Sequence, residues 1–207
     1  MELFNFHFAN LKNKQLSYNQ FTNTYDCSSG IKNHNFYPSF KVFIENLVKN
    51  ENKKQLIIIE TYFVNNDNTE NDVNSTVLFN NIVSKYGGIL FSCNKINNNA
   101  KINSQNIRYI NMDSVIFLDS LTVNLKHNDT YKNVFLNIYL NTYNKNKSSI
   151  ENANHYINEY KAIKPYLSNG SQIIINTFND DNFTSLIKKE FPNNNLIFDK
   201  NQLIYLF

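Results

Sequence analysis

Runs of apolar residues alternate with helix-like apolar spacing along the chain, and this alternation predicts an α/β domain. Leu56–Glu60 holds four consecutive large apolar side chains and a carboxylate, which is typical of a strand buried on both faces. Behind it, the helix-starting residues Asn74, Ser75 and Thr76 precede apolar residues that recur at helical spacing from 77 to 86. In open α/β sheets, ligands bind at the loop that follows a central strand, so we expect function here.

The same alternation continues toward the carboxyl end of the chain. Strands are predicted at 89–93, 107–110, 134–140 and 172–175, and helices at 38–48, 113–125, 151–167 and 180–190. Two final apolar runs, 195–198 and 202–206, are separated by only three residues, so they can only pair as antiparallel neighbours. The predicted fold class is therefore α/β: a Rossmann-like, doubly wound, mostly parallel sheet with a C-terminal antiparallel hairpin. We expect residues 38–207 to form this domain, and the aromatic-rich residues 1–37 to form an N-terminal arm or cap.

Composition narrows the classes of partner and compartment. A chain of 207 residues suits one domain, and a net charge of +3 does not argue for a nucleic-acid or membrane surface. The two cysteines, Cys27 and Cys93, have no metal-ligand spacing and suit a reducing compartment. Neither a membrane-spanning apolar stretch nor a basic-then-apolar leader is found. We therefore expect a cytoplasmic protein that binds no nucleic acid and no membrane.

Asparagine dominates the residue usage in a way that affects the interpretation of candidate sites. The chain contains 42 asparagines and a single arginine, Arg108. This usage is what an AT-rich coding sequence would produce, as in a large DNA virus, where the location would be the host cytoplasm, or in a protist. Because such drift would turn Asp into Asn at tolerant positions, an Asn in place of an expected carboxylate does not by itself exclude function.

Six passages resemble one enzyme family. They are Ile58–Thr61 at the end of the first strand, Asn74–Thr76 at the polar start of the first helix, 85–94 over the second strand, 111–118 before a helix, 135–143 over the fourth strand, and Tyr160–Ile175, which introduces the fifth strand. Together with the terminal hairpin, they resemble the class I S-adenosylmethionine-dependent methyltransferases over residues 38–207. Within that family, they most resemble the branch that methylates hydroxyls of sugars, macrolides and catechols.

The resemblance implies a cofactor, a reaction and a set of site residues. The cofactor would be S-adenosylmethionine, and the methyl acceptor a hydroxyl of a small molecule such as a sugar. The cofactor-binding residues would be Glu60, Thr61, Tyr62, Ser75, Thr76, Asn94, Asp113, Ser114 and Asn141. His155 and Tyr143 are the candidate catalytic residues, and no metal is expected. The N-terminal arm could cover the pocket or a partner in a homodimer.

Several of these positions have a second interpretation. Glu60 could contact a ligand ammonium group or accept hydrogen bonds from local backbone amides. Ser75 and Thr76 could bind an anion at a helix N-terminus or simply cap that helix.

Two further pairs of residues also have two possible interpretations. Asp113 and Ser114 could border an adenine or only start a helix. His155 and Glu159, four residues apart, could form a general-base pair for a hydroxyl or lie on a solvated helix face.

The chain also departs from the family pattern. Tyr62 stands where the family has a glycine, next to the amino-acid end of the cofactor. Asn94 replaces the acidic residue that accepts from the ribose hydroxyls, which removes a charge-assisted bond. Asn141 and Asn176 stand where the metal-dependent branch has acids. These departures support a second hypothesis, a catalytically inactive methyltransferase fold that serves as a binding or scaffold subunit. A third, another nucleotide-binding α/β domain, lacks a glycine-rich phosphate loop.

Overall fold

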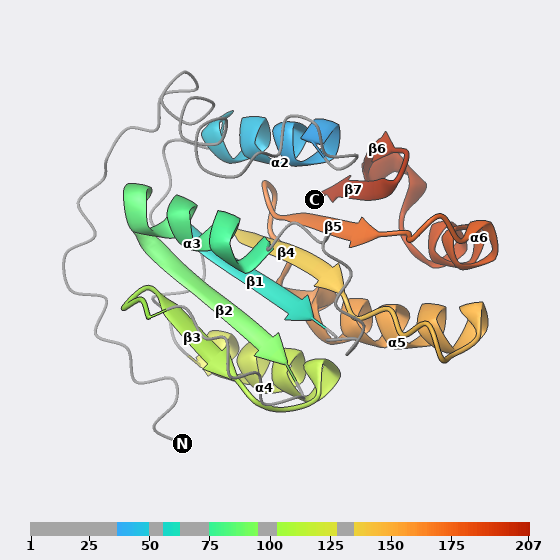
Figure 1. The fold of residues 1–207 in the computed structure, drawn as a ribbon, viewed down its shortest axis with the longest axis horizontal. Helices are drawn as coiled ribbons and strands as arrows, with labels where there is room; N and C mark the ends of the chain where they lie inside the picture. Colours follow the sequence, from blue (N-terminus) through green and yellow to red (C-terminus); the bar gives the residue numbers. More distant parts are fainter. Residues whose placement is uncertain (1–36, 50–55, 63–74, 95–102, 128–134) are drawn as a thin grey trace.

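The computed structural model describes residues 37–49, 56–62, 75–94, 103–127 and 135–207. They form one seven-stranded sheet flanked by helices (Figure 1). The strands are β1 Leu56–Tyr62, β2 Gly88–Asn94, β3 Ile107–Ile110, β4 Leu136–Asn141, β5 Gln172–Asn176, β6 Leu196–Asp199 and β7 Gln202–Leu206. The helices are α2 Tyr37–Lys49, α3 Ser75–Tyr86, α4 Ser114–His127, α5 Ser149–Ile163 and α6 Asp181–Glu190, with short 3₁₀ turns η4 Lys164–Tyr166 and η5 Asn193–Asn195. The predicted arm lies outside the described residues, apart from Tyr37, which begins α2.

The sheet has the strand order β3-β2-β1-β4-β5-β7-β6. β1 pairs in parallel with both β2 and β4, so it is an internal strand, and β3 and β5 extend the parallel part on either side. β7 runs antiparallel to β5, and β6 antiparallel to β7. These pairings confirm the predicted mostly parallel sheet and its C-terminal antiparallel hairpin.

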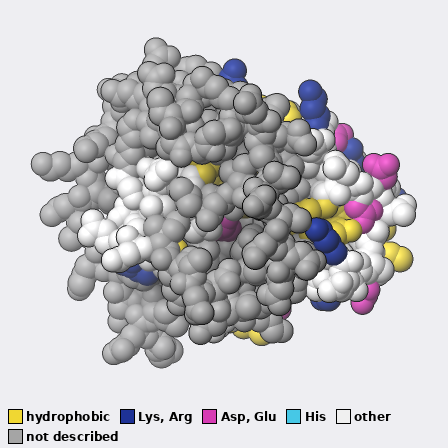
Figure 2. Space-filling model, viewed as in Figure 1, with side chains coloured by type: hydrophobic (Ala, Val, Ile, Leu, Met, Phe, Trp, Pro, Cys, Tyr) yellow, Lys and Arg dark blue, Asp and Glu magenta, His cyan; other side chains and the backbone are white. Residues whose placement is uncertain are grey.

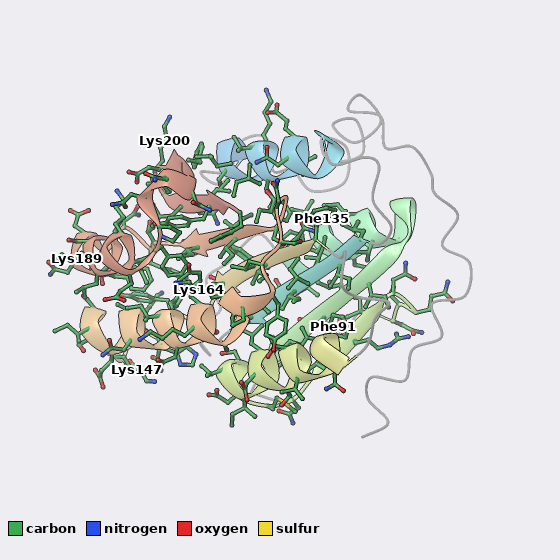
Figure 3. The ribbon with its side chains drawn as sticks, turned by 180° about the vertical axis from the view of Figure 1, so that it is seen from behind. Phe91, Phe135, Lys147, Lys164, Lys189 and Lys200 are labelled. Atoms are coloured by element: carbon green, nitrogen blue, oxygen red, sulfur yellow. The ribbon has the colours of Figure 1, made fainter. Side chains whose placement is uncertain are left out.

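Helices cover both faces of the sheet. Ile58 packs with α2 and α3 on one face, while Ile57 and Ile59 pack with α4, α5 and α6 on the other. Figure 3, seen from behind, shows α4 and α5 side by side across the second face. Successive residues of β1 thus enter two separate apolar clusters, which confirms that this strand is buried on both faces.

The helix predicted at 151–167 has different ends in the structure. It begins at Ser149, after a capping box in which Ser148 and Glu151 each bond the other's backbone amide. It ends at Ile163, and a 3₁₀ turn containing Pro165 follows. Lys164 still has helical dihedral angles, but Pro165 has no amide hydrogen to donate to the carbonyl four residues earlier, so the α-helical hydrogen-bond pattern is interrupted there.

The surface of the described residues carries mixed charge. On the face shown in Figure 2, the coloured Lys, Asp and Glu side chains are interspersed and form no continuous basic patch within the described part. Each helix that the structure describes is too short or too polar to cross a lipid bilayer. In parallel sheets of this kind, ligands bind at the carboxyl ends of the strands, so the candidate site is sought there.

Candidate functional site

The carboxyl ends of the three central parallel strands lie level with one another. Tyr62, the last residue of β1, is in register with Asn94 at the end of β2 and with Asn141 at the end of β4. The strand pairing thus brings together three of the predicted site residues. Predictions about the side chains of Tyr62 and Asn94 lie outside the described part of the structure.

Glu60 accepts hydrogen bonds from three hydroxyl groups near the end of β1. Its side chain is fully buried, and it accepts from Ser75, from Thr76 Oγ1 at 2.7 Å and from Ser92 Oγ at 3.1 Å. Burial raises the pKa of Glu60 above its ordinary value of 4.5, although the three hydroxyl donors act to lower it. Among the described residues, Glu60 therefore accepts hydrogen bonds from side-chain hydroxyls. Ser75 and Thr76 point their hydroxyls toward β1.

The raised pKa of Glu60 predicts a pH-dependent stability. A carboxyl with a higher pKa in the folded than in the unfolded protein stabilises the fold fully below the unfolded value of about 4.5. That contribution is lost as pH rises through the folded pKa. We expect Glu60→Gln, which cannot ionise, to flatten the fall in the free energy of unfolding that wild type shows as pH rises above about 4.5. Urea unfolding measures the slope, with the exposed Glu190→Gln as control. Equal slopes in Glu60→Gln and wild type would contradict the prediction.

Thr61 follows Glu60 on β1 and points to the other face of the sheet. Its side chain is fully buried, and its Oγ1 has no hydrogen-bond partner among the described residues. An unsatisfied buried hydroxyl costs about 1 to 3 kcal/mol. This atom is therefore available to a partner that the described residues do not supply.

Asp113 and Ser114 begin α4, as predicted. Asp113 Oδ1 accepts from the backbone amides of Val115 at 3.0 Å and Ile116 at 3.4 Å, which confirms the helix-start interpretation. The Ser114 hydroxyl is buried and lies 3.0 Å from His155 Nε2 on α5. Contact of this pair with an adenine stays a prediction.

The interpretation of His155 and Glu159 as a solvated helix face is wrong. Glu159 is fully buried, and its Oε1 lies 3.5 Å from His155 Nε2, while the His155 side chain is 26% exposed. Burial acts to lower the pKa of His155, but the hydrogen bond to Glu159 and the negative charges of Glu159 and Asp113 outweigh it, so the pKa is raised above 6.5. Sequence spacing alone could not distinguish this buried pair from a solvated one, because α5 carries polar residues on its inward side as well.

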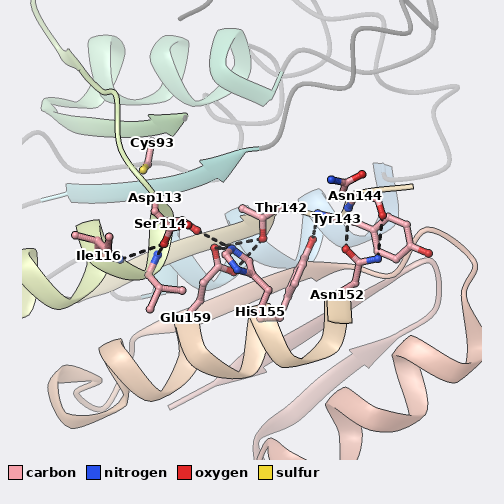
Figure 4. Close-up of polar contacts among 12 residues, drawn as sticks. Cys93, Asp113, Ser114, Ile116, Thr142, Tyr143, Asn144, Asn152, His155 and Glu159 are labelled. Carbon is pink, nitrogen blue, oxygen red and sulfur yellow. Dashed lines mark hydrogen bonds and ion pairs between the residues drawn. The ribbon is translucent and has the colours of Figure 1, made fainter. Parts of the chain in front are cut away.

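Three side chains of α5 hold three consecutive residues after β4 (Figure 4). Asn152 accepts from the Asn144 amide at 2.8 Å and donates to the Asn144 carbonyl at 3.0 Å. One turn further, the Tyr156 hydroxyl accepts from the Tyr143 amide at 3.0 Å. Glu159 then accepts from Thr142 Oγ1, with distances of 3.2 and 3.3 Å to its two oxygens. Asn152 and Tyr156 are not among the predicted site residues. Their signal in the sequence is a pair of polar groups at positions i and i+4 of an inward helix face.

Tyr143 joins the loop after β4 to the loop after β5. Its hydroxyl donates to Asp180 Oδ2 at 2.8 Å, and its ring stacks on Phe178 with a centroid distance of 4.6 Å. Burial and the bond to Asp180 raise the pKa of Tyr143 to about 12. Phe178 and Asn179 have φ angles of 53° and 57°, a left-handed conformation that is rare for a bulky residue such as Phe. The catalytic role predicted for Tyr143 stays a prediction, and its hydroxyl is committed to Asp180.

Asn141 contacts Asn176 at the ends of β4 and β5. Asn176 Nδ2 donates to Asn141 Oδ1 at 3.2 Å. The part of the chain that the structure describes contains no group of three or more His, Cys, Asp and Glu residues placed to hold a metal ion. In this structure, the two positions form an amide pair.

The strand order and the terminal antiparallel strands define a class of fold. Comparison with solved structures finds similar folds, among them structures of two methyltransferases, MycE and CalS11. The chain therefore has the class I S-adenosylmethionine-dependent methyltransferase fold, as its resemblance predicted. No protein-family model matches the sequence, and the search of curated proteins finds no similar sequence.

Three of the similar structures belong to two named enzymes. One is apo CalS11, a TDP-rhamnose 3'-O-methyltransferase of calicheamicin biosynthesis, with a TM-score of 0.56 and 9% identity over 95% of this chain and 89% of that one. Another is MycE from the mycinamycin pathway with Mg and SAH, with a TM-score of 0.54 and 12% identity over 94% of this chain and 55% of that one. The structure of MycE with Mg, SAH and mycinamycin VI has a TM-score of 0.52 and 12% identity, over 84% of this chain and 50% of that one. The chain thus spans about half the length of MycE, and at these identities the similarity shows the fold alone.

Proposed function

We propose that this chain is an S-adenosylmethionine-dependent methyltransferase that transfers a methyl group to a hydroxyl of a small molecule such as a sugar. The cofactor would bind along the carboxyl ends of β1, β2 and β4 and the start of α4. The acceptor would lie against the loops after β4 and β5. Named activities of CalS11 and MycE, on a sugar nucleotide and in a macrolide pathway, support this class of acceptor.

The observation that carries the proposal is the ordered exit of β4. Asn152, Tyr156 and Glu159 hold Asn144, Tyr143 and Thr142 through hydrogen bonds. Methyl transfer depends chiefly on holding donor and acceptor in line, and on excluding water. A loop fixed in this way by a neighbouring helix suits that requirement, because a site needs a supporting shell that locks its geometry.

The residues near the end of β1 fit the amino-acid end of the cofactor. An ionised carboxylate has about four acceptor positions, and the three hydroxyls on Glu60 leave one for an ammonium donor. The Thr61 hydroxyl lacks a partner among the described residues. Glu60, Thr61, Ser75 and Thr76 would therefore hold this end. When bound, the cofactor supplies an electrophilic methyl group on a sulfonium.

The remaining predicted contacts belong to the other end of the cofactor and to the acceptor. Asn94 would accept from a ribose hydroxyl, Asp113 and Ser114 would border the adenine, and Asn141 would lie beneath the methyl donor. Tyr143 would contact the acceptor through its ring. His155 would act as a base only if its Nε2 exchanged Ser114 for the acceptor hydroxyl while the imidazole was neutral.

Titration calorimetry with S-adenosylmethionine and S-adenosylhomocysteine tests the proposal. We expect saturable binding of both, and tighter binding in Tyr62→Gly, because glycine lets the backbone approach the cofactor without a Cβ in the way. An affinity gain of about tenfold corresponds to 1.4 kcal/mol. Absence of heat at millimolar ligand would instead favour the inactive binding or scaffold subunit. Unchanged or weaker binding in Tyr62→Gly would show that Tyr62 does not occupy the glycine position of the family.

A matched control distinguishes an effect at the proposed cofactor pocket from a general effect of removing a tyrosine ring. Tyr166 lies in η4, directly after α5 and away from the carboxyl ends of the strands. Tyr166→Gly is therefore expected to leave both affinities unchanged. An equal gain in this variant would point to a change in global flexibility rather than to the cofactor loop.

A further inference from the structure

A polar network beneath the carboxyl edge of the sheet joins three elements (Figure 4). Ser114 on α4 contacts His155 on α5, with 3.0 Å between Oγ and Nε2. The same Nε2 lies 3.5 Å from Glu159 Oε1. Glu159 in turn accepts from Thr142, the residue that follows β4. A continuous path of contacts thus runs from the start of α4, through α5, to the exit of β4.

The fully buried position of Glu159 is costly for a carboxylate. Its neighbours on the inward face of α5 are Tyr156, Tyr160 and Ile163, all buried in the apolar cluster of this side of the sheet. Effective penalties for burying one charge amount to several kcal/mol, and an apolar side chain at such a place is often equally stable or more so. Stability alone therefore does not account for a carboxylate here, whereas fixing one relative placement of its partners does.

Under the proposed function, Ser114 and Thr142, the two ends of the network, border different ligands. Ser114 lies at the end where the proposed function places the adenine. Thr142 begins the loop where the proposed function places the acceptor. A side-chain connection between them couples the two rims of the pocket directly.

We propose that Glu159 and His155 are positioning residues that hold the first turn of α4 and the exit of β4 in one arrangement, so that cofactor and acceptor binding are coupled. This inference rests on the proposed function. Glu159 fixes the imidazole, which fixes Ser114, and it fixes Thr142 directly. The connection is strongest when the imidazole is protonated and pairs with the carboxylate.

The charges around the network set the direction of its pH dependence. His155 faces Glu159 on its own helix, Asp113 before α4 and Lys147 before α5. Glu159 also acts on the Cys93 thiol of β2 and on the Tyr156 hydroxyl. Because the folded pKa of His155 is raised above 6.5, its pairing with Glu159 is complete below that value and is lost as pH rises through the folded pKa.

The experiment compares wild type, two network variants and one control in calorimetric titrations with S-adenosylhomocysteine between about pH 6 and 9. We expect wild-type affinity to fall about threefold to tenfold as His155 deprotonates. His155→Gln should keep a hydrogen bond to Ser114 but lose this pH dependence. Glu159→Gln should bind about tenfold more weakly at pH 6 and show the same flat profile. Glu190→Gln, an exposed glutamate on α6, is the matched control and should follow wild type.

The outcomes separate this inference from the proposed function. If wild type binds no S-adenosylhomocysteine, the proposed function fails. The network is then still tested by NMR, in which the amide resonances of both Ser114 and Thr142 should shift with the His155 titration. If wild type binds and both variants keep its affinity and pH profile, the positioning role is overturned. A His155→Gln variant with unchanged affinity but a lower methyl-transfer rate would assign His155 to proton transfer and also overturn it.

Discussion

Replacing Asn152 by alanine is expected to loosen the exit of β4 and to lower the free energy of unfolding by about 2 kcal/mol. Asn152 is 1% exposed and bonds both the amide and the carbonyl of Asn144, at 2.8 and 3.0 Å. Its Nδ2 is also within 3.3 Å of the Lys147 carbonyl and 3.1 Å of the Ser148 carbonyl. Each such bond contributes about 0.5 to 1.5 kcal/mol. The total is reduced because Asn144 is partly exposed, so water can replace some of the bonds.

Denaturant unfolding and amide hydrogen exchange measure this effect together. Exchange at Tyr143 and Asn144 should become faster in Asn152→Ala, while the amides of β4 itself should keep their protection. Asn154→Ala provides the control, since Asn154 lies on the exposed side of the same helix. Surface substitutions of this kind change stability by about 0.5 kcal/mol or less. Equal effects of the two substitutions would contradict the conclusion that α5 orders residues 142–144 after β4.

A loose exit of β4 would also affect function in a recognisable way. Under the proposed function, Asn152→Ala should weaken acceptor binding and slow methyl transfer but leave the affinity for S-adenosylhomocysteine close to wild type. The network of Ser114, His155 and Glu159 reaches Thr142, whereas Asn152 bonds Asn144, so Asn152→Ala loosens the far part of this loop while the network stays in place. This separation distinguishes loss of acceptor order from loss of the cofactor pocket.

The order of strands and helices along the chain was predictable because the spacing of apolar residues reflects which side chains are buried. The all-apolar run 56–59 and the short connection before 202–206 left little choice for the strand type and the terminal hairpin. The position of β7 between β5 and β6 was not predictable from the hairpin, because either strand of an antiparallel pair could have joined β5. That choice depends on how the whole hairpin packs, which local sequence does not record.

The supporting contacts of the candidate site were harder to predict. Glu159 and Asn152 are buried polar residues on a helix that also exposes polar residues, so their sequence pattern resembles that of a solvated face. The left-handed backbone conformation at Phe178 and Asn179 could not be predicted, because neither position is a glycine. In both cases, the tertiary partner decides the conformation. Apolar periodicity therefore predicts the sheet edge that carries the candidate site, but not the side chains that hold the loops at this edge in place.

Gly88→Ala is expected to have the largest effect on stability, about 3 kcal/mol, because the start of β2 has no room for a methyl group. Gly88 is in register with Leu56 at the start of β1. An added Cβ would lie 2.6 Å from the Leu56 carbonyl oxygen and 2.9 Å from its Cβ. The closest of these atoms belongs to the backbone, so no side-chain rotation can relieve the clash, and the two central strands must move apart. Overpacking in a well-packed core typically costs about 1 to 3 kcal/mol, and sometimes more.

Urea unfolding of Gly88→Ala and of a neighbouring control tests this explanation. Gly87 has a φ of 78°, a conformation that Asn tolerates better than other side chains, so Gly87→Asn should cost about 1 kcal/mol or less. Truncation in Leu56→Ala should not rescue Gly88→Ala, because it leaves the carbonyl oxygen and the Cβ of Leu56 in place. Rescue by that truncation would show that the Leu56 side chain, not the backbone, limits the space.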